Sequence, residues 1–181
     1  MADGTWNPIT DGSVLSIVIN GADVYVGGSF TNIGSSITGR RGIAKLSSTG
    51  TGLADATWNP DSDNDIFSIV VNGTDVYVGG QFTYIGGAAR NRIAKLSSTG
   101  TGLADPAWSI SLNSFIYLNS LVFDSGVLYA GGSFTSPTNY FLVTGIFSVP
   151  TLGEWGMIIL GVLFIFAGYR YISRRNTARI V

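Results

Sequence analysis

Short apolar runs separated by glycine-rich turns fill residues 1–148. Residues 13–19 (SVLSIVI) and 66–71 (IFSIVV) are rich in β-branched side chains, which are typical of strands. Asn-Gly follows each run, at Asn20-Gly21 and Asn72-Gly73, and DVYVGG comes next, so each segment predicts a β-hairpin. The IAKL segments predict a further strand that ends in a Ser-Ser-Thr-Gly-Thr-Gly loop. We therefore expect an all-β fold with three or four short antiparallel strands per unit.

These elements recur with a period near fifty residues. The segment IAKLSSTGTGLAD at residues 43–55 returns unchanged at residues 93–105. A third copy is looser, with Val127 in place of the recurring aspartate. The period is typical of repeat architectures, and it predicts units at about 1–53, 54–103 and 104–148. The recurring positions are Trp6, Asp23, Tyr25, Gly27, Gly28 and Phe30, then Trp58, Asp75, Tyr77, Gly79, Gly80 and Phe82, then Trp108, Tyr129, Gly131, Gly132 and Phe134.

The unit resembles the delta-60 type of bacterial β-propeller repeat, in which a VYVGGxF strand, a glycine-rich loop and an IAKL-like strand recur at this spacing. The third copy departs after Phe134, where FLVTGIF at 141–147 replaces the IAKL strand. The resemblance implies that the units are propeller blades. Because propellers close with four to eight blades, we expect three blades to be part of a larger propeller in a longer gene product. Self-association of three-blade chains into a closed ring is the alternative.

Residues 149–181 follow a different pattern. The apolar run at 155–172 contains one charge, Arg170, near its end. About eighteen residues at about 1.5 Å each reach about 27 Å, enough to cross a bilayer core. Trp155 marks one edge, and Tyr169 with Tyr171 marks the other, as aromatic belts do. The run therefore predicts a single transmembrane helix at about 155–172, with a buried core helix as the alternative.

A basic end at 173–181 follows the apolar run. Arg174, Arg175 and Arg179 join Arg170 there, and no acidic residue follows Glu154. Positive charges are retained on the cytoplasmic side of membranes. The C-terminus is therefore predicted to be cytoplasmic, with the repeats outside.

The motif VPTLGEWG at 149–156 precedes the span. In order, motif, span and basic end resemble the IPTL-type C-terminal sorting domain of Gram-negative bacteria, a relative of the PEP-type tails handled by exosortases. The matching positions are Pro150, Thr151, Leu152, Trp155 and Gly156, while Val149 replaces isoleucine. The resemblance implies that a membrane-embedded exosortase recognises the motif, cuts near it, and releases or transfers the repeats. A permanent single-span anchor is the alternative.

Composition narrows the chemistry that the chain can perform. Cysteine and histidine are absent, so thiol chemistry and the commonest general base are missing. Residues 1–148 carry ten Asp against six Lys and Arg, a net charge of about −4, which argues against a nucleic-acid partner. Asp55 and Asp105 recur at equivalent points, which favours a turn device over an active site. We predict no catalytic residues, no cofactor and no metal.

Two local features leave alternatives open. The DSDND segment at 61–65, which the first and third units lack, offers carboxylate and amide oxygens for Ca²⁺, but the Gly and distal Glu of an EF-hand loop are missing. We interpret it as a solvated polar loop, with calcium binding as the alternative. The repeated Trp and Tyr residues predict repeat cores, with sugar-stacking platforms as the alternative.

The expected function is that of an exported bacterial cell-surface protein, a non-enzymatic interaction or structural module. Its predicted partners are the exosortase, the membrane, and a surface polysaccharide or protein bound by the repeats. It would pass through the inner membrane and then reach the cell surface or the medium. The alternative is the C-terminal part of a secreted hydrolase or lyase whose catalytic residues lie in upstream blades.

Overall fold

The computed structural model describes residues 4–34, 39–110, 117–133 and 141–145 of the chain. They all belong to the first of two compact units, Met1–Gly145 and Ile146–Val181. Among the described residues, no helix is long and apolar enough to cross a membrane. The transmembrane helix predicted at 155–172 lies outside the described residues and stays a prediction.

The described part of the chain forms three antiparallel sheets of three strands each, and the predicted all-β class is confirmed. A two-stranded hairpin, β6 (Tyr84–Ile85) with β7 (Ala88–Ala89), lies within the second repeat. Propeller closure and membership of the delta-60 repeats stay predictions. The first sheet contains β1 (Ser13–Asn20), β2 (Asp23–Ser29) and β3 (Ile43–Ser47); the second contains β4 (Ile66–Asn72), β5 (Asp75–Gly80) and β8 (Ile93–Ser97); the third contains β9 (Leu118–Asp124), β10 (Val127–Gly132) and β11 (Phe141–Gly145).

The register shows how closely the repeats correspond. Gly28 pairs with Val14, Gly80 with Ile66 and Gly132 with Leu118, so these positions are equivalent in the three sheets. β11 pairs with β10 as β3 pairs with β2, so the divergent FLVTG segment still supplies the third strand. The possible fourth strand shrinks to single bridges, Leu46 to Ala54 and Leu96 to Ala104.

The hairpin turns lie one residue later than the sequence predicted. Asn20 still pairs with Asp23, so the two loop residues are Gly21 and Ala22. Gly21 has a φ of 61°, a left-handed conformation that glycine adopts without the steric cost of a side chain. Asn20 is therefore the last paired residue of β1, and Gly21 is the first residue of the turn.

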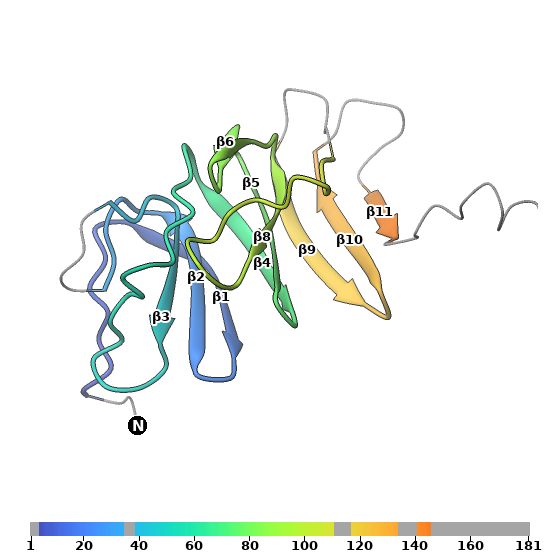
Figure 1. Ribbon diagram of the computed structural model, residues 1–181. Helices are drawn as coiled ribbons and strands as arrows, with labels where there is room; N and C mark the ends of the chain where they lie inside the picture. The colour runs from blue at the N-terminus through green and yellow to red at the C-terminus, as the bar shows by residue number, and fades with distance from the viewer. Residues whose placement is uncertain (1–3, 35–38, 111–116, 134–140, 146–181) are drawn as a thin grey trace, which may run out of the picture. The chain divides into compact units, whose positions relative to one another are not determined.

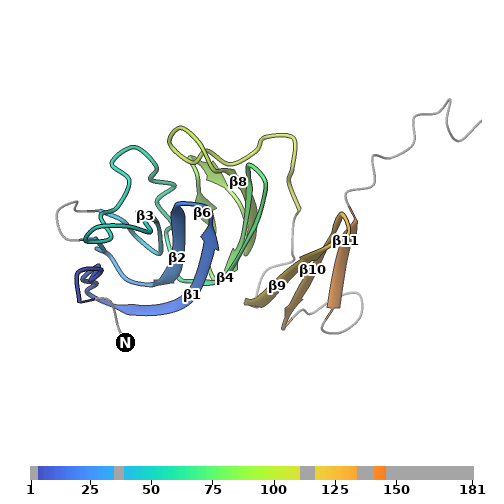
Figure 2. The ribbon, with the colours of Figure 1, turned by 90° about the horizontal axis from the view of Figure 1, so that it is seen from below.

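The three sheets follow one another in a row within this unit (Figures 1 and 2). We call the face that carries Tyr25 and Gly27 the receiving face of the first sheet, and the face of the second sheet that meets it, carrying Ile66 and Ile69, an inserting face. A Cβ atom at Gly27 would lie 2.7 Å from Ile66 Cγ2. Glycine therefore lets the two sheets approach closely.

Tryptophan residues pack at the junctions between neighbouring repeats. Trp58 is fully buried, lies edge-on to Tyr25 with ring centroids 5.3 Å apart, and donates its indole N–H to the carbonyl of Ser97 at 2.8 Å. Trp108 contacts Tyr77 in the same way at 5.7 Å. The core interpretation is confirmed for Trp58, Tyr25 and Tyr77, which have no exposed surface.

Candidate functional site

The residues predicted to carry the sorting function lie outside the described part of the chain. They are the motif residues Val149, Pro150, Thr151, Leu152, Trp155 and Gly156 and the basic residues Arg170, Arg174, Arg175 and Arg179. Within the repeats, the recurring aspartates and the exposed sheet faces are the remaining candidates for a functional site.

Asp55 joins the first repeat to the second. Its Oδ2 lies 2.6 Å from Lys45 Nζ, and its Oδ1 accepts the backbone N–H groups of Thr57 and Trp58 at 2.9 and 3.1 Å. Burial alone would raise the pKa of Asp55, but the hydrogen bonds from Lys45 and the two backbone groups lower it below its ordinary value. The carboxylate thus positions Trp58 at the start of the next repeat. This agrees with the prediction that Asp55 stabilises a turn.

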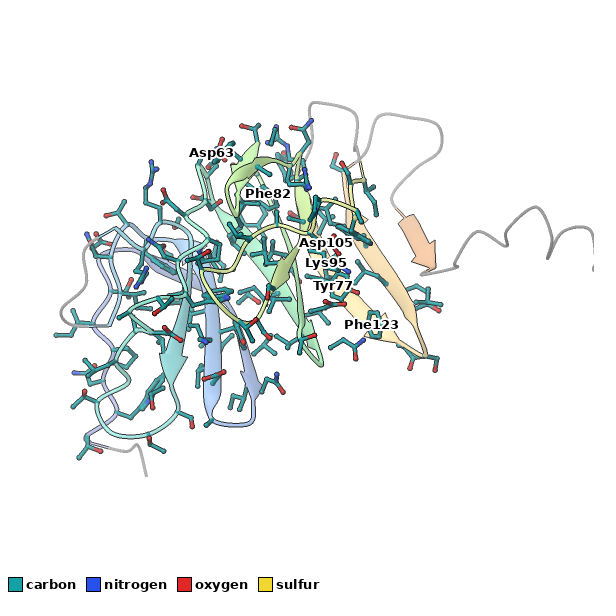
Figure 3. The ribbon with its side chains drawn as sticks, in the orientation of Figure 1. Asp63, Tyr77, Phe82, Lys95, Asp105 and Phe123 are labelled. Carbon is teal, nitrogen blue, oxygen red and sulfur yellow. The ribbon has the colours of Figure 1, made fainter. Side chains whose placement is uncertain are left out.

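The same arrangement recurs between the second and third repeats. Lys95 Nζ lies 2.6 Å from Asp105 Oδ2 and 3.6 Å from Asp75 Oδ2. Figure 3 shows Lys95, Asp105 and Tyr77 gathered in one region of the molecule. Burial would lower the pKa of Lys95, but the hydrogen bond that Lys95 donates to Asp105 and the charges of Asp75 and Asp105 raise it. The lysine stays charged and holds two aspartates.

The loop at 61–65 is more ordered than a solvated loop. Asp63 accepts the backbone N–H groups of Thr83 and Tyr84 at 2.8 and 3.0 Å, and its second oxygen accepts the Thr83 hydroxyl. Asp11 makes the same bonds to Thr31 and Asn32 in the first repeat. The first unit lacks the DSDND string, but Asp11 stands in the position of Asp63, so this part of the loop recurs in both repeats.

A small polar cavity of about 150 Å³ adjoins this loop. Typical ligand pockets enclose roughly 300–1,000 Å³. Asp61 at the loop forms an exposed ion pair with Arg41 at 3.1 Å. Among the described residues, no group of three or more carboxylates lies close enough to hold a metal ion. The cavity is lined by Ser29, Phe30, Thr31, Arg41, Gly42, Ser62, Asp63, Asn64 and Asp65.

Two arginines hold the unit junctions, and sequence reasoning missed them. Arg40 is 2% exposed and donates from Nη2 to the carbonyls of Asp55 and Ala56 at 2.6 and 3.1 Å. Arg90 donates to the carbonyl of Asp105 at 2.9 Å. Burial lowers the pKa of Arg40. The signal was the recurrence of an arginine shortly before each IAKL segment, at an offset of fifty residues.

The outer face of the first sheet exposes apolar side chains. Val14, Ile17 and Ile19 are 38%, 59% and 71% exposed. In the second sheet, Ile66 and Ile69 are the equivalents of Val14 and Ile17 and are 0% and 3% exposed, while Val71, the equivalent of Ile19, is half-buried. A group of exposed apolar side chains is a candidate interaction surface.

Comparison with known proteins identifies only the end of the chain. No curated protein and no solved structure matches it. Residues 147–175 match the IPTL-CTERM motif family. This segment contains the predicted motif at 149–156 and Arg170, Arg174 and Arg175, while Arg179 lies beyond it. The chain therefore ends in a segment similar to the C-terminal sorting signals of exported proteins.

Proposed function

We propose that this protein is exported and reaches the bacterial cell surface through a C-terminal sorting signal that an exosortase cuts. The repeats then act outside the cell as a non-enzymatic interaction or structural module. The observation that carries the proposal is the IPTL-CTERM match at residues 147–175, placed directly after an all-β repeat unit.

The chemistry of the tail supports passage through a membrane. An apolar run at 155–172 follows the motif, and arginines cluster after it. A helix of this length crosses a bilayer core, and clustered arginines keep its end in the cytoplasm. The motif at 149–156 then lies at the outer edge of the membrane, where a membrane-embedded protease reaches it.

The repeats support a binding or structural role. Asp55 and Asp105, which are prominent candidates for acid–base chemistry, bind lysines and backbone N–H groups that hold the repeats together. The sheets are the blades of a propeller of delta-60 type, and their loops contact a surface polysaccharide or protein.

A pair of variants expressed in the native host tests the sorting step. Replacing Trp155 and Gly156 with alanine removes the two most distinctive motif positions, and we expect the full-length chain to accumulate in the membrane fraction. Gly153→Ala is the matched control, because Gly153 occupies a variable position of the same motif. Immunoblotting of membrane, surface and medium fractions follows the product. Normal processing of the double variant contradicts the proposal.

A further inference from the structure

On the first sheet, the part of the inserting face that β1 carries is exposed, whereas Val24 and Val26 of β2, on the same face, are buried in a cluster with Phe30 and Trp6. Inside the row, Ile66 and Ile69 of β4 and Leu118 and Leu121 of β9 are each at most 5% exposed. They pack on the receiving face of the preceding sheet. The equivalent residues of β1 are Val14 and Ile17, which are 38% and 59% exposed. Ile19, the equivalent of the half-buried Val71 and Phe123, is 71% exposed.

The third sheet carries the complementary receiving face. Its register places Ser120 and Gly131 where the second sheet has Ser68 and Gly79. A Cβ atom at Gly79 would lie 2.1 Å from Leu118 Cδ2, whereas at Gly131 the nearest atom in the described chain is Ser120 Cβ at 3.8 Å. Val122, on the same face as Ser120, is 54% exposed. Within the described part of the chain, the space that a neighbouring sheet fills beside Gly79 is therefore open beside Gly131.

Hydrogen bonds also distinguish the two kinds of face. Ser16 Oγ on the first receiving face accepts the backbone N–H of Ile69 at 3.0 Å. Ser68 Oγ on the second accepts the backbone N–H of Leu121 at 2.9 Å. Each junction thus combines an apolar residue over glycine with one serine acceptor. Ser120 offers the same acceptor on the third sheet, and it is exposed.

We propose that a second copy of this chain docks its inserting face on the receiving face of the third sheet, and that the reciprocal contact closes a ring of two chains. Val14 of the second copy then lies over Gly131, as Ile66 lies over Gly27. The backbone N–H of Ile17 of the second copy donates to Ser120 Oγ. Both contacts repeat the interface between sheets within the chain, so the occupant is fixed by continuity with that interface.

The number of blades in a closed propeller ring favours two copies of the chain. Two chains with three sheets each supply six sheets, and propeller rings contain four to eight blades. A head-to-tail contact that closes into a ring covers the inserting face of the first sheet and the receiving face of the third sheet in both copies. Neither face is then left to extend a fibre. A lipid surface would cover Ile17 and Ile19, but it would leave the serine acceptor and the space at Gly131 unused. This inference is independent of the sorting signal.

The molar mass of the full chain in detergent micelles tests the proposal. Light scattering after size exclusion at micromolar concentration should give a protein mass of two copies. Gly131→Val should halve it, because the added side chain fills the docking space while its surroundings within the described chain are open. Gly4→Val is the matched control and should keep the two-copy mass, since nothing lies within 4 Å of a Cβ at Gly4. Circular dichroism and the unfolding midpoint check that both variants fold.

A single-copy mass for the unaltered chain overturns the proposal. So does a two-copy mass that Gly131→Val leaves unchanged, since that would place the contact elsewhere, for example in the tail. A ladder of larger species overturns the closed ring.

Cross-linking locates the contact directly, because the chain contains no cysteine. One chain carries Ile19→Cys and the other carries Val122→Cys; their equivalents Phe123 and Val70 pack in one cluster within the chain. A short bismaleimide should link the mixed chains. Leu53→Cys, at a residue 51% exposed, replaces Ile19→Cys in the control mixture and should give no link with Val122→Cys. Equal yields in the two mixtures overturn the proposal.

Discussion

Glycine at position 79 sets how closely the second and third sheets approach. Leu118 Cδ2 occupies the space that a Cβ atom would need, at 2.1 Å, and Leu118 Cγ lies at 3.2 Å. Leu118 is fully buried, so its side chain has little room to move. The absence of a Cβ atom at Gly79 thus allows the two sheets to pack this closely.

Gly79→Ala should therefore lower the free energy of unfolding by about 1–3 kcal/mol through overpacking. Gly131→Ala makes the same change at the equivalent strand position, where the nearest atom of the described residues is 3.8 Å away, and should cost much less. Denaturation in detergent micelles, followed by tryptophan fluorescence at low protein concentration, measures both variants. Equal losses would show that glycine is needed there for backbone reasons alone.

Asp55 couples stability to acid pH. Its folded pKa lies below its ordinary value, so its contribution is complete above the unfolded pKa of about 3.9 and is lost as pH falls through the folded pKa. Asp55→Asn should lower stability at neutral pH by about 1–3 kcal/mol and flatten the loss on acidification. Asp61→Asn is the control, because its exposed ion pair with Arg41 contributes about 0–1 kcal/mol. An unchanged acid profile in Asp55→Asn would contradict this assignment.

Some residue roles could be predicted, and others needed the fold. Asp55 was recognisable as a turn device because it recurs beside a fixed sequence. Arg40 was not, because a charged side chain becomes buried only when the chain folds back to bring carbonyl groups to it. The role of Asp63 was missed because its partners Thr83 and Tyr84 lie about twenty residues away.

Serine in the first strand of the first and second sheets joins each sheet to the next. Ser16 and Ser68 accept backbone N–H groups from the next sheet, and donor and acceptor are 53 positions apart in the sequence in both cases. The bonds fix the sheets relative to each other along the strand direction. Apolar packing alone would tolerate a shift between them.

Ser68→Ala should leave the Leu121 N–H without its acceptor and cost about 1–2 kcal/mol, the expense of an unsatisfied buried group. Ser120→Ala removes the equivalent hydroxyl from the outer face of the third sheet and should leave chain stability nearly unchanged. Chemical denaturation at low concentration compares them, and hydrogen exchange at the Leu121 amide shows whether its protection falls. A stability loss at Ser120 as large as at Ser68 would contradict this role.

Strands were the most predictable elements, because β-branched runs and DVYVGG segments specify them locally. The turns shifted by one residue because Asn20 and Asn72 pair across the ladder with Asp23 and Asp75. The fourth strand reduced to a single bridge because Ala54 meets Leu46 at one position only. The number of ladder bonds that a segment makes depends on its neighbour, which local sequence does not specify.

At the scale of the whole molecule, the chain combines β-sheet repeats with a C-terminal segment similar to the IPTL-CTERM motif. The period near fifty residues predicted three similar units, and three similar sheets are present. The tail was recognised from its motif, and its match to the IPTL-CTERM family rests on residues 147–175. The packing of the sheets could not be predicted from the period alone. It depends on which face of each sheet carries the glycine that lets the next sheet approach.

The central claim is that the tail is removed after it has directed the protein to the surface. Mass spectrometry of the C-terminus tests it most directly, on native protein recovered from the cell surface and medium of its own host. We expect a terminus near residues 149–152, with the apolar run absent. An intact Val181 in the membrane fraction would contradict the claim and identify the tail as a permanent anchor.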